Sequence, residues 1–395
     1  MKYAILLPDG AADEPLPKLD GRTPLEAALI PNMDSVAASG LLGRAVTIPE
    51  GFTPGTDVGT LSVLGYDPHR YYSGRAPLEA AAKGLAVRPD QMIFRCNFVT
   101  VGDGLMRDNT AGHIAQDEAD ALISDLDAAL RGDGCEFHSG VTYRHLMLLK
   151  DAAGLALRCA PPHDIIDQPV TKHAPSGTGA ERVTGIMEKA ATLIAGHPVN
   201  RRRQEKGKAP VTGIWLWGQG RPTPFESFAS RFGPKGAVIT AVDILRGMAN
   251  LMGMRLIEVP GATGYIDTNY EGKGRAAARA LDEFDLVIVH VEAADEAAHM
   301  GSPEEKVKAL ERIDEAVAGP LLERLRRFPE WRVLVAADHP TECVSRGHSA
   351  VPPPFCYAGA GIAPNGGARF TEAAADRTGL WADPGHELME AFIRR

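Results

Sequence analysis

Cysteine is scarce in this chain of 395 residues. The five cysteines are scattered and include no Cys-x-x-Cys pair, so a disulfide framework is not predicted and we expect reduced thiols. These cysteines are Cys96, Cys135, Cys159, Cys343 and Cys356.

Long apolar runs are also absent from the sequence. No stretch approaches the roughly 20 apolar residues of a membrane span. The first apolar run ends at Pro8, which is too short for a signal peptide. We therefore expect a soluble, cytoplasmic protein without a membrane partner.

An excess of positive charge is missing as well. The net charge of −9 argues against a nucleic-acid partner, although local arginines can still hold small anionic substrates. A nucleotide cradle of the form Gly-x-x-x-x-Gly-Lys-Ser/Thr is also lacking. The nearest stretch, Glu271–Gly274, has neither the spacing nor the hydroxyl, which speaks against a kinase.

The length predicts two domains, or one domain with a large insertion, because a chain of 395 residues exceeds the usual size of one hydrophobic core. We expect residues 1–75 and 205–395 to form the main domain and residues 76–204 to form an inserted domain. No internal repeat or low-complexity segment interrupts this pattern.

Three short apolar runs in the main domain predict buried parallel strands, at Tyr3–Leu7, Leu286–Val291 and Val333–Ala337. Residues Lys306–Leu325 between the last two have apolar side chains at helical spacing. This alternation predicts an α/β domain with helices on both faces of a mostly parallel sheet. Ligands of such sheets bind at the carboxyl ends of the strands.

The inserted domain has a different pattern, which predicts an α+β fold. We expect strands at 95–101, 137–150 and 155–159, and amphipathic helices at 117–130 and 181–194. The basic stretch from Asn200 to Pro210, including Arg201 to Arg203, is expected to be a solvated surface crossing back to the main domain.

Polar residues with metal-ligand chemistry follow the second and third apolar runs. Asp295 and His299 are four residues apart, so both side chains lie on one helix face, although this spacing is also common at solvated helix starts. Asp338 and His339 leave a buried strand, where either a metal or a cap would satisfy them. His348 alone is compatible with an ordinary surface histidine.

Two further candidates lie in the first part of the chain. Asp9 follows the first strand in a Pro-Asp-Gly sequence that is also a common turn. Thr56 precedes a helical run, where its hydroxyl could meet a phosphoryl group at the helix N-terminus or serve only as an N-cap.

Together these residues predict a catalytic metal site. Oxygen and nitrogen ligands without cysteine suit Mn²⁺, Mg²⁺ or Zn²⁺ in an open catalytic site better than a closed structural zinc. Six such ligands and a hydroxyl are too many for one open site and suit two.

The order of these motifs resembles a known family. PDG, PGTDVGTLSVLGYDP, HVEAADEAAH and AADHPTECVSRGH follow the metal-ligand and nucleophile order of the cofactor-independent (2,3-bisphosphoglycerate-independent) phosphoglycerate mutases. These are members of the alkaline phosphatase superfamily. GVTYRHLMLLK, PPHDIIDQPV, HPVN, WLWGQG and PGATGYIDTNYEGK extend the resemblance to the archaeal-type branch across most of the chain. Some bacterial members of this branch are named as proposed homoserine kinases.

The resemblance implies an alkaline-phosphatase-like core with an inserted α+β lid domain. It also implies two divalent metal ions, with Mn²⁺ first and Mg²⁺ or Zn²⁺ as alternatives, and no 2,3-bisphosphoglycerate. One metal would be held by Asp295, His299 and His348, and the other by Asp9, Thr56, Asp338 and His339. Thr56 would be the nucleophile, where the mutases usually have serine.

The activity implied is interconversion of 3-phosphoglycerate and 2-phosphoglycerate in glycolysis and gluconeogenesis, through a phosphothreonine. The resemblance gives four candidates for binding the phosphorylated acid, which are Arg75, Arg107, Arg144 and Lys273. For each of them, an ordinary surface charge or salt bridge remains the alternative. His113 and Asp108 are the candidates for proton transfer between glycerate hydroxyls. A homoserine kinase-like phosphotransferase, a metal-dependent phosphomonoesterase and a non-catalytic binding module remain as alternatives.

Overall fold

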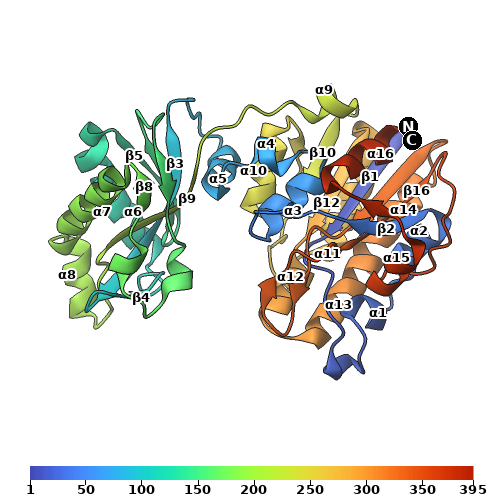
Figure 1. Ribbon diagram of the computed structural model, residues 1–395, viewed down its shortest axis with the longest axis horizontal. Coiled ribbons are helices and arrows are strands. Elements are labelled where there is room, and N and C mark those ends of the chain that lie inside the picture. The colour runs from blue at the N-terminus through green and yellow to red at the C-terminus, as the bar shows by residue number, and fades with distance from the viewer. Residues whose placement is uncertain (395) are drawn as a thin grey trace. The chain divides into compact units, whose positions relative to one another are not determined.

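The computed structural model describes residues 1–394 as two compact units (Figure 1). The core unit contains Met1–Tyr72 and the residues from Phe225 onward, and the inserted unit contains Ser73–Pro224. The expected α/β core interrupted by an α+β insertion is confirmed. Each unit has its own hydrophobic core.

The core unit is built on an eight-stranded sheet. The five strands from β11 to β13 in the sheet order are parallel, whereas β16 runs antiparallel to both of its neighbours. The order is β11 (Arg255–Leu256), β10 (Gly236–Ile239), β12 (Leu286–Val291), β1 (Lys2–Pro8), β13 (Trp331–Ala336), β16 (Pro354–Gly359), β2 (Leu41–Ala45) and β17 (Trp381–Ala382).

The three predicted strands lie side by side at the centre of this sheet. β1 pairs with β12 on one side and with β13 on the other, and both pairs are parallel. All six residues of β12 are buried, which explains why its sequence is almost entirely apolar instead of alternating. The carboxyl ends of β12, β1 and β13 therefore share one edge of the sheet.

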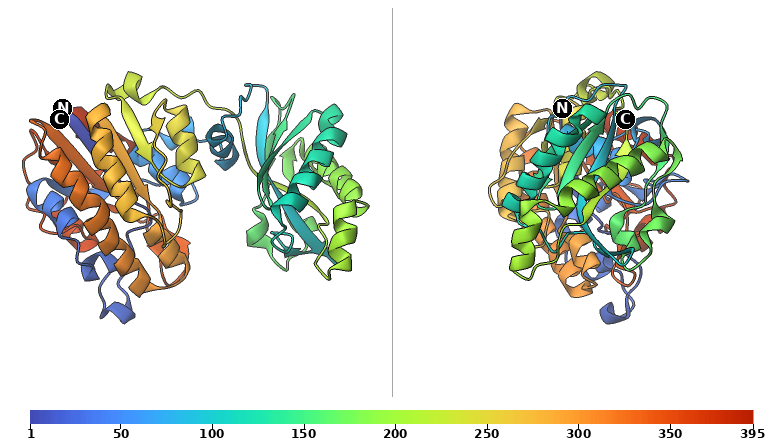
Figure 2. Two further views of the ribbon diagram at one scale, coloured as in Figure 1. Left: turned by 180° about the vertical axis from the view of Figure 1, so that it is seen from behind. Right: turned by 90° about the vertical axis from the view of Figure 1, so that its left-hand side faces the viewer.

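Helices cover both faces of the sheet (Figure 2). The apolar cluster on one face includes residues of α2, α11, α13 and α14, and Phe392 of α16 packs edge-on against Tyr3 of β1 and Tyr357 of β16 on the other. The bounds are α2 (Pro31–Ser39), α3 (Thr56–Val63), α10 (Asp243–Leu251), α11 (Tyr270–Glu283), α12 (Ala293–His299), α13 (Pro303–Ile313), α14 (Gly319–Leu325), α15 (Glu372–Thr378) and α16 (Leu388–Arg394).

The helix predicted at 306–325 is divided by a π-helical turn at Asp314–Ala318. The Asp314 carboxylate accepts hydrogen bonds from the main-chain N–H groups of Asn32 and Met33, at 3.1 and 2.7 Å. These are N–H groups of the first turn of α2, which lack partners within their own helix. The irregular turn thus carries the acidic side chain that caps α2.

The inserted unit contains a five-stranded sheet in which every pairing is antiparallel. Its core lies between this sheet and two long helices, as expected for an α+β fold. The elements are β3 (Met92–Gly102), β4 (Leu105–Asp108), β5 (Cys135–Val141), β6 (Arg144–Leu149), β9 (Gly213–Gly220), α5 (Arg75–Ala82), α6 (Gln116–Leu130), α7 (Ala180–Ala195) and α8 (Pro198–Glu205), with a ribbon of β7 (Ala156–Arg158) and β8 (Ser176–Thr178).

Three details of the inserted unit differ from the prediction. Residues 137–150 form a hairpin of two strands instead of one strand. β9 was assigned to the main domain, but it pairs with β3 and so belongs to the inserted unit. The expected solvated crossing forms α8, in which Arg203 is 1% exposed and donates to the carbonyl oxygens of Ala209 and Ala111.

Candidate active site

Polar residues gather at the carboxyl edge of the central strands. Asp9 follows β1, α12 follows β12 after one residue, and Asp338 and His339 follow β13. The four segments that carry the predicted metal ligands and Thr56 all belong to the core unit. Their convergence follows from the parallel order of the strands, because each strand ends at the same edge.

Two glycines allow the segments to approach one another. Gly10 has φ +61°, and a Cβ there would lie 2.8 Å from the Cα of Asp295. Gly59 of α3 is in helical conformation, but its Cβ would lie 2.4 Å from the carbonyl oxygen of Asp338. Because real Cβ contacts are longer, glycine is required at both positions for the turn after β1 and for α3 to pack as they do.

The first cluster consists of Asp295, His299 and His348. The Nε2 atoms of His299 and His348 are 3.0 Å apart. They lie 3.1 and 3.3 Å, respectively, from carboxylate oxygens of Asp295. Three ligand atoms thus face a common point, as a metal ion requires.

The second cluster consists of Asp9, Asp338 and His339, with Thr56 beside it. His339 Nε2 lies 3.3 Å from Asp9 Oδ1, 3.5 Å from Asp338 Oδ2 and 3.3 Å from Thr56 Oγ1. Thr56 is the first residue of α3, so its hydroxyl lies at the N-terminal end of that helix. The carboxylates and the imidazole of this cluster are fully or almost fully buried.

The two clusters are neighbours. The rings of His339 and His348 are 4.3 Å apart between centroids. The hydroxyl of Thr341 donates to Asp295 Oδ1 at 2.5 Å and lies 3.2 Å from His339 Nδ1, so one side chain contacts both sets. The structure therefore brings together all seven residues of the predicted metal and nucleophile set.

The three imidazoles share one orientation. The Nδ1 atom of each faces a main-chain carbonyl oxygen, from Arg346 for His299, from Pro54 for His348 and from Pro340 for His339. In the neutral form of each ring, donation from Nδ1–H to these carbonyls would leave the Nε2 lone pair available to a metal ion, which would then replace the proton that Nε2 shares with Asp295 in His299 and His348. Imidazoles that ligate metals are held in this way.

The charges of the clusters call for a cation. Burial, and then the carboxylates of Asp338 and Asp295, raise the pKa of Asp9 well above its usual value. Burial alone would raise the pKa of Asp295 as well, but hydrogen bonds from His299 and His348 hold it well below the usual range. The same contact with Asp295 raises the pKa of His299 to about 9.

The donor set fits divalent metal ions. Asp9 Oδ1 is buried and has no hydrogen-bond partner among the described residues, which is costly for a carboxylate oxygen unless a cation meets it. Carboxylates and imidazoles without thiolates suit Mn²⁺, Mg²⁺ or Zn²⁺. We therefore regard each cluster as able to hold one ion.

Several contributors to this site were not predicted from the sequence. His290, inside β12, is 0% exposed and lies 2.8 Å from Asp9 Oδ2 through Nε2. Burial, followed by the nearby Lys273 charge, lowers the pKa of His290 to about 3. Thr60 donates to Asp338 Oδ2 at 3.0 Å. The only sequence signal for His290 was an imidazole within an otherwise apolar run.

Lys306 joins two of the segments that carry ligands. It is fully buried in α13 and donates to the carbonyl oxygens of Ala12 and Thr341 and to Asp13 Oδ2, at 2.9, 2.6 and 3.0 Å. Ala12 and Asp13 follow the Asp9 turn, and Thr341 follows His339. One buried ammonium thus joins the segment after the Asp9 turn, 294 residues before it in the chain, to the segment after His339, 35 residues after it.

Lys273 does not lie where a substrate-binding residue was expected. It is 1% exposed in α11, and its ammonium donates to the carbonyl oxygen of His290 at 3.0 Å. Burial lowers its pKa to about 8. Lys273 therefore supports the strand beneath the second cluster instead of presenting its charge to a ligand, because α11 packs that face against the sheet.

The remaining predicted residues lie in the inserted unit. Arg75 begins α5 and lies 3.5 Å from Glu79, Arg107 of β4 pairs with Asp167 at 2.9 Å, and Arg144 is exposed at the start of β6. Their charges are thus accessible or only partly neutralised within this unit.

Asp108 and His113 belong to one tight loop of the inserted unit. Asp108 accepts from the N–H and hydroxyl of Thr110 at 2.7 and 2.6 Å, and from the N–H of Gly112 at 2.7 Å. Ala111, Gly112 and His113 all have positive φ. The carboxylate therefore holds a strained loop, and the His113 imidazole is exposed at its end.

Arg95 was not among the predicted residues, although it lies in the same unit as Arg75. Its guanidinium is 4.1 Å above the Trp217 ring and 3.1 Å from Glu79, and burial lowers its pKa to about 10. The Arg75 and Arg144 charges contribute to this lowering. Arg75 and Arg95 both lie beside Glu79, and planar guanidinium groups of this kind are suited to binding anions.

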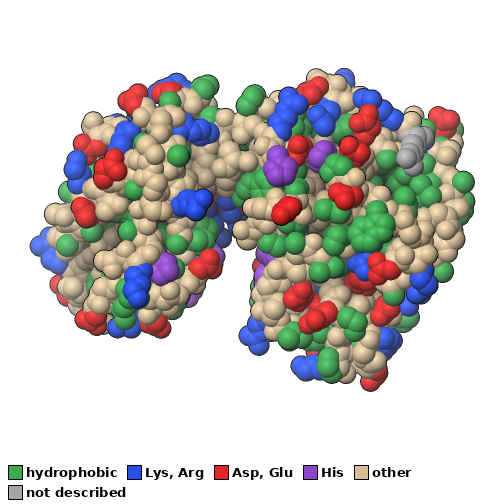
Figure 3. All heavy atoms as spheres, in the orientation of Figure 1, with side chains coloured by type: hydrophobic (Ala, Val, Ile, Leu, Met, Phe, Trp, Pro, Cys, Tyr) green, Lys and Arg blue, Asp and Glu red, His purple; other side chains and the backbone are tan. Residues whose placement is uncertain are grey.

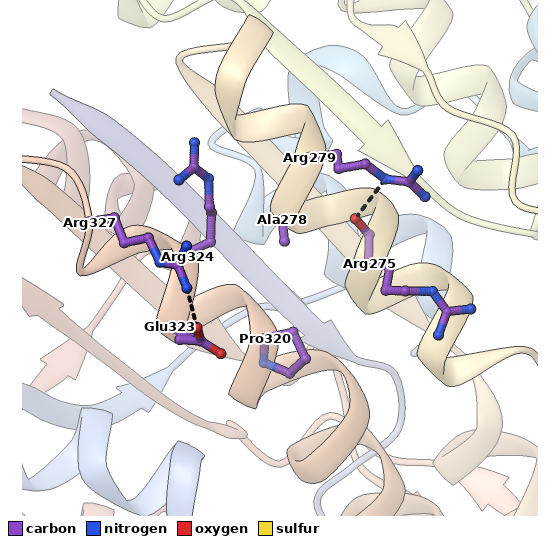
Figure 4. Close-up of a pocket in the computed structure, with 7 residues that line it drawn as sticks. All are labelled: Arg275, Ala278, Arg279, Pro320, Glu323, Arg324 and Arg327. Atoms are coloured by element: carbon purple, nitrogen blue, oxygen red, sulfur yellow. Dashed lines mark hydrogen bonds and ion pairs between the residues drawn. The ribbon is translucent and has the colours of Figure 1, made fainter.

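A separate hollow of about 490 Å³ lies beside α11 and α14 in the core unit (Figure 4). It is lined mainly by arginines, of which Arg327 pairs with Glu323 and Arg324 pairs with Asp282. None of the predicted site residues lines it. Elsewhere, charges of both signs are interspersed over the surface of each unit in the view of Figure 3. Within residues 1–394, no helix has the length and apolar character needed to cross a bilayer.

Comparisons with known proteins identify the family. The family model described as 2,3-bisphosphoglycerate-independent phosphoglycerate mutase matches residues 37–200. A curated protein of that name from Methanothrix thermoacetophila is 48% identical over 394 residues and is covered completely, as is this chain. A probable enzyme of that name from Geobacter sulfurreducens is 44% identical over 400 residues, again with both chains covered completely.

Solved structures agree with this result. A protein from Pyrococcus horikoshii superposes with a TM-score of 0.82 and 29% identity, over 99% of this chain and 96% of its own. The cofactor-independent phosphoglycerate mutase from Thermoplasma acidophilum has a TM-score of 0.68 and 26% identity, over 100% and 99% of the two chains. The chain belongs to the family of 2,3-bisphosphoglycerate-independent phosphoglycerate mutases.

Proposed function

We propose that the chain interconverts 3-phosphoglycerate and 2-phosphoglycerate through a phosphothreonine at Thr56. The family supports the substrate class, because the Methanothrix and Geobacter relatives carry this activity in their names. The observation that carries the mechanism is the placement of the Thr56 hydroxyl at the start of α3, 3.3 Å from His339 in the second cluster.

Two divalent ions complete this site in the proposal. One would be held by Asp295, His299 and His348, and the other by Asp9, Thr56, Asp338 and His339. When bound, the ions supply Lewis acidity for the Thr56 oxygen and for the phosphoryl oxygens, whose charge needs stabilisation during transfer. Mn²⁺ is the first choice and Mg²⁺ or Zn²⁺ the alternatives.

The chain's own residues supply the nucleophile. The Thr56 hydroxyl loses its proton as its oxygen attacks phosphorus, the bond from phosphorus to the 3-oxygen of glycerate breaks, and that oxygen takes up a proton. The 2-hydroxyl of the retained glycerate then attacks the phosphorus of the phosphothreonine and loses its proton. The bond from phosphorus to the Thr56 oxygen breaks, and that oxygen takes up a proton again. The N-terminal N–H groups of α3 favour the phosphoryl group in both steps.

Residues of the inserted unit bind and orient glycerate in this proposal. Arg75, Arg107 and Arg144 provide cations for the carboxylate and the phosphate. His113 moves protons between the glycerate hydroxyls, and Asp108 contributes by holding the His113 loop. Exclusion of water by this unit keeps the phosphothreonine from hydrolysing before the second transfer.

A coupled assay for 2-phosphoglycerate, with Mn²⁺ and without 2,3-bisphosphoglycerate, tests the reaction. We expect Thr56→Ala to reduce isomerisation by at least about 1,000-fold. Thr56→Ser replaces the secondary hydroxyl with a primary one and should retain activity. Acid quenching of the wild type followed by peptide mass spectrometry should find phosphate on Thr56. Isomerisation that persists in Thr56→Ala would reject the covalent mechanism.

Two other outcomes would select a different reaction. Release of inorganic phosphate faster than isomerisation would identify a phosphomonoesterase that uses the same hydroxyl. ATP-dependent phosphorylation of homoserine would identify a kinase-like phosphotransferase, although the sequence contains no nucleotide cradle of the P-loop type.

A further inference from the structure

A chain of hydrogen bonds crosses three neighbouring strands beneath the second cluster. His290 of β12 lies between Asp9, which follows β1, and Thr240, which follows β10. Its Nε2 atom is 2.8 Å from Asp9 Oδ2, and its Nδ1 atom is 3.2 Å from the Thr240 hydroxyl. The imidazole is 0% exposed, so bulk solvent does not reach these contacts.

The proton positions along these hydrogen bonds can be assigned from the Asp9 end. An ionised Asp9 carboxylate can only accept, so we assign the proton of the neutral His290 ring to Nε2, and the Thr240 hydroxyl, which accepts from the main-chain N–H of Val242 at 3.1 Å, then donates to Nδ1. A neutral imidazole that accepts at Nδ1 carries its proton on Nε2 and donates it to Asp9. The carbonyl oxygen of His290 in turn accepts from the Lys273 ammonium. Main-chain and side-chain contacts thus fix the ring from both sides.

This arrangement treats the two oxygens of Asp9 differently. Oδ2 accepts from His290, whereas Oδ1 has no hydrogen-bond partner among the described residues and lies 3.3 Å from His339 Nε2. The hydrogen bond from His290 to Oδ2 therefore orients the carboxylate so that Oδ1 can bind a metal ion in the second cluster. Loss of the His290 contact would leave the side chain able to turn about its terminal torsion, which is broad for aspartate.

We propose that His290 is a positioning residue, which holds Oδ2 of Asp9 so that Oδ1 faces the second cluster and which thereby sets the affinity for the divalent ion bound there. The inference rests on the proposed function in one respect, that Asp9 is a metal ligand. It adds a residue outside both proposed ligand sets. Partners that orient ligands typically contribute about 10- to 100-fold to metal affinity.

Calorimetric titration of the metal-free protein with Mn²⁺ tests this role without an activity measurement. The titrations use the His299→Ala background, in which the first cluster is disabled and the second can be measured alone. We expect His290→Leu to weaken Mn²⁺ binding about 10- to 100-fold. His290→Gln should bind within about 3-fold of the parent, because the glutamine amide nitrogen can occupy the position of Nε2 and donate to Asp9.

A matched control comes from a second buried histidine. His145 in the inserted unit is 2% exposed, and His145→Leu should leave Mn²⁺ affinity unchanged. Thr240→Val provides a milder perturbation should His290→Leu fail to fold. It removes the donor to Nδ1 and should weaken binding in the same direction, and thermal melts of the metal-free proteins establish folding.

The possible outcomes separate this inference from the proposed function. Wild-type protein that binds no Mn²⁺ would overturn both. Wild-type protein that binds two ions, together with a folded His290→Leu variant of undiminished affinity in the His299→Ala background, would overturn the role of His290 alone. Weak Mn²⁺ binding by a folded His290→Gln variant would also overturn it, because a hydrogen-bond donor at the position of Nε2 would then not be sufficient to hold Asp9.

Discussion

Substituting alanine for Gly10 tests how closely the turn after β1 is packed against the first cluster. Gly10 has φ +61°, and an added Cβ would lie 2.8 Å from both Cα and Cβ of Asp295 and 2.5 Å from the hydroxyl oxygen of Thr341. The substitution therefore combines backbone strain with overlap against a predicted ligand. Either the turn or the start of α12 must shift.

The two contributions can be estimated separately. The left-handed conformation costs alanine about 1–2 kcal/mol, and forcing an extra methyl group into a packed region costs about 1–3 kcal/mol. Gly10→Ala should thus lower the free energy of unfolding by about 2–5 kcal/mol. Gly21 has φ +76° and no atom within 4 Å of its added Cβ, so Gly21→Ala should show only the strain contribution.

Gly59→Ala isolates the other contribution. Gly59 is helical without positive φ, but its added Cβ would lie 2.4 Å from the carbonyl oxygen of Asp338. The gain in helix propensity, about 1 kcal/mol for Gly to Ala, opposes the cost of this overlap. The displacement should appear mainly at the second cluster, whereas Gly10→Ala should affect the first.

Urea unfolding of the metal-free proteins and Mn²⁺ calorimetry measure these effects. We expect Gly10→Ala to lose more stability than Gly21→Ala and to bind Mn²⁺ more weakly, while Gly21→Ala keeps wild-type affinity. Equal destabilisation by the two variants, with unchanged metal affinity, would refute the close packing of the Gly10 turn on Asp295.

Three other predictions follow from buried charged and polar groups. Lys306→Met should lower the free energy of unfolding by about 3–5 kcal/mol in urea titrations, because it leaves Asp13 buried without its cation. Combining Lys306→Met with Asp13→Leu should recover part of that loss. An undiminished stability of the single variant would contradict the argument. Chelation of divalent ions should lower the melting temperature measured by calorimetry, since an ion at 1,000 times its Kd stabilises the folded state by about 4 kcal/mol; an identical melting temperature with and without chelator and Mn²⁺ would oppose a metal site. Burial lowers the pKa of His145 to about 4, below the value of about 6.5 in unfolded chains. As pH falls from 6.5 to 4, protonation of the unfolded state should therefore lower the free energy of unfolding by about 3 kcal/mol. His145→Asn should reduce this pH dependence in urea titrations, and an unchanged pH dependence in the variant would contradict the argument.

The central strands could be predicted because burial on both faces makes their sequences almost wholly apolar. β9 was placed in the wrong domain for a physical reason. Its partner β3 precedes it by more than 100 residues, and only this pairing reveals that Gly213–Gly220 belongs to the inserted sheet. The basic stretch before β9 suggested a domain boundary. Arg203 in that stretch is instead buried and donates to the carbonyl oxygen of Ala111, a contact that the local sequence does not indicate.

The site residues divide in the same way. Asp9, Asp295 and Asp338 could be predicted because each follows a buried strand, and parallel strands end at one edge. The role of His290 could not be predicted, because it depends on Asp9 and Thr240, which follow β1 and β10 and come close only in the folded sheet. The burial of Lys273 likewise depends on which face of α11 packs against the sheet.

The stability of the core unit and the order of its site depend on the same contacts. His339 and His348 are oriented by main-chain carbonyls of loops, and the loop after β13 is held by Lys306 through Thr341. Because carbonyl acceptors move only when the backbone moves, side-chain substitutions on these loops can leave the imidazoles in place. A change that frees the backbone of the loop, such as the loss of the Lys306 ammonium, should instead lower the stability and the metal affinity together. The ligands would then be ordered by the fold before an ion binds, and the repulsion among three buried carboxylates would be the cost that the ion relieves.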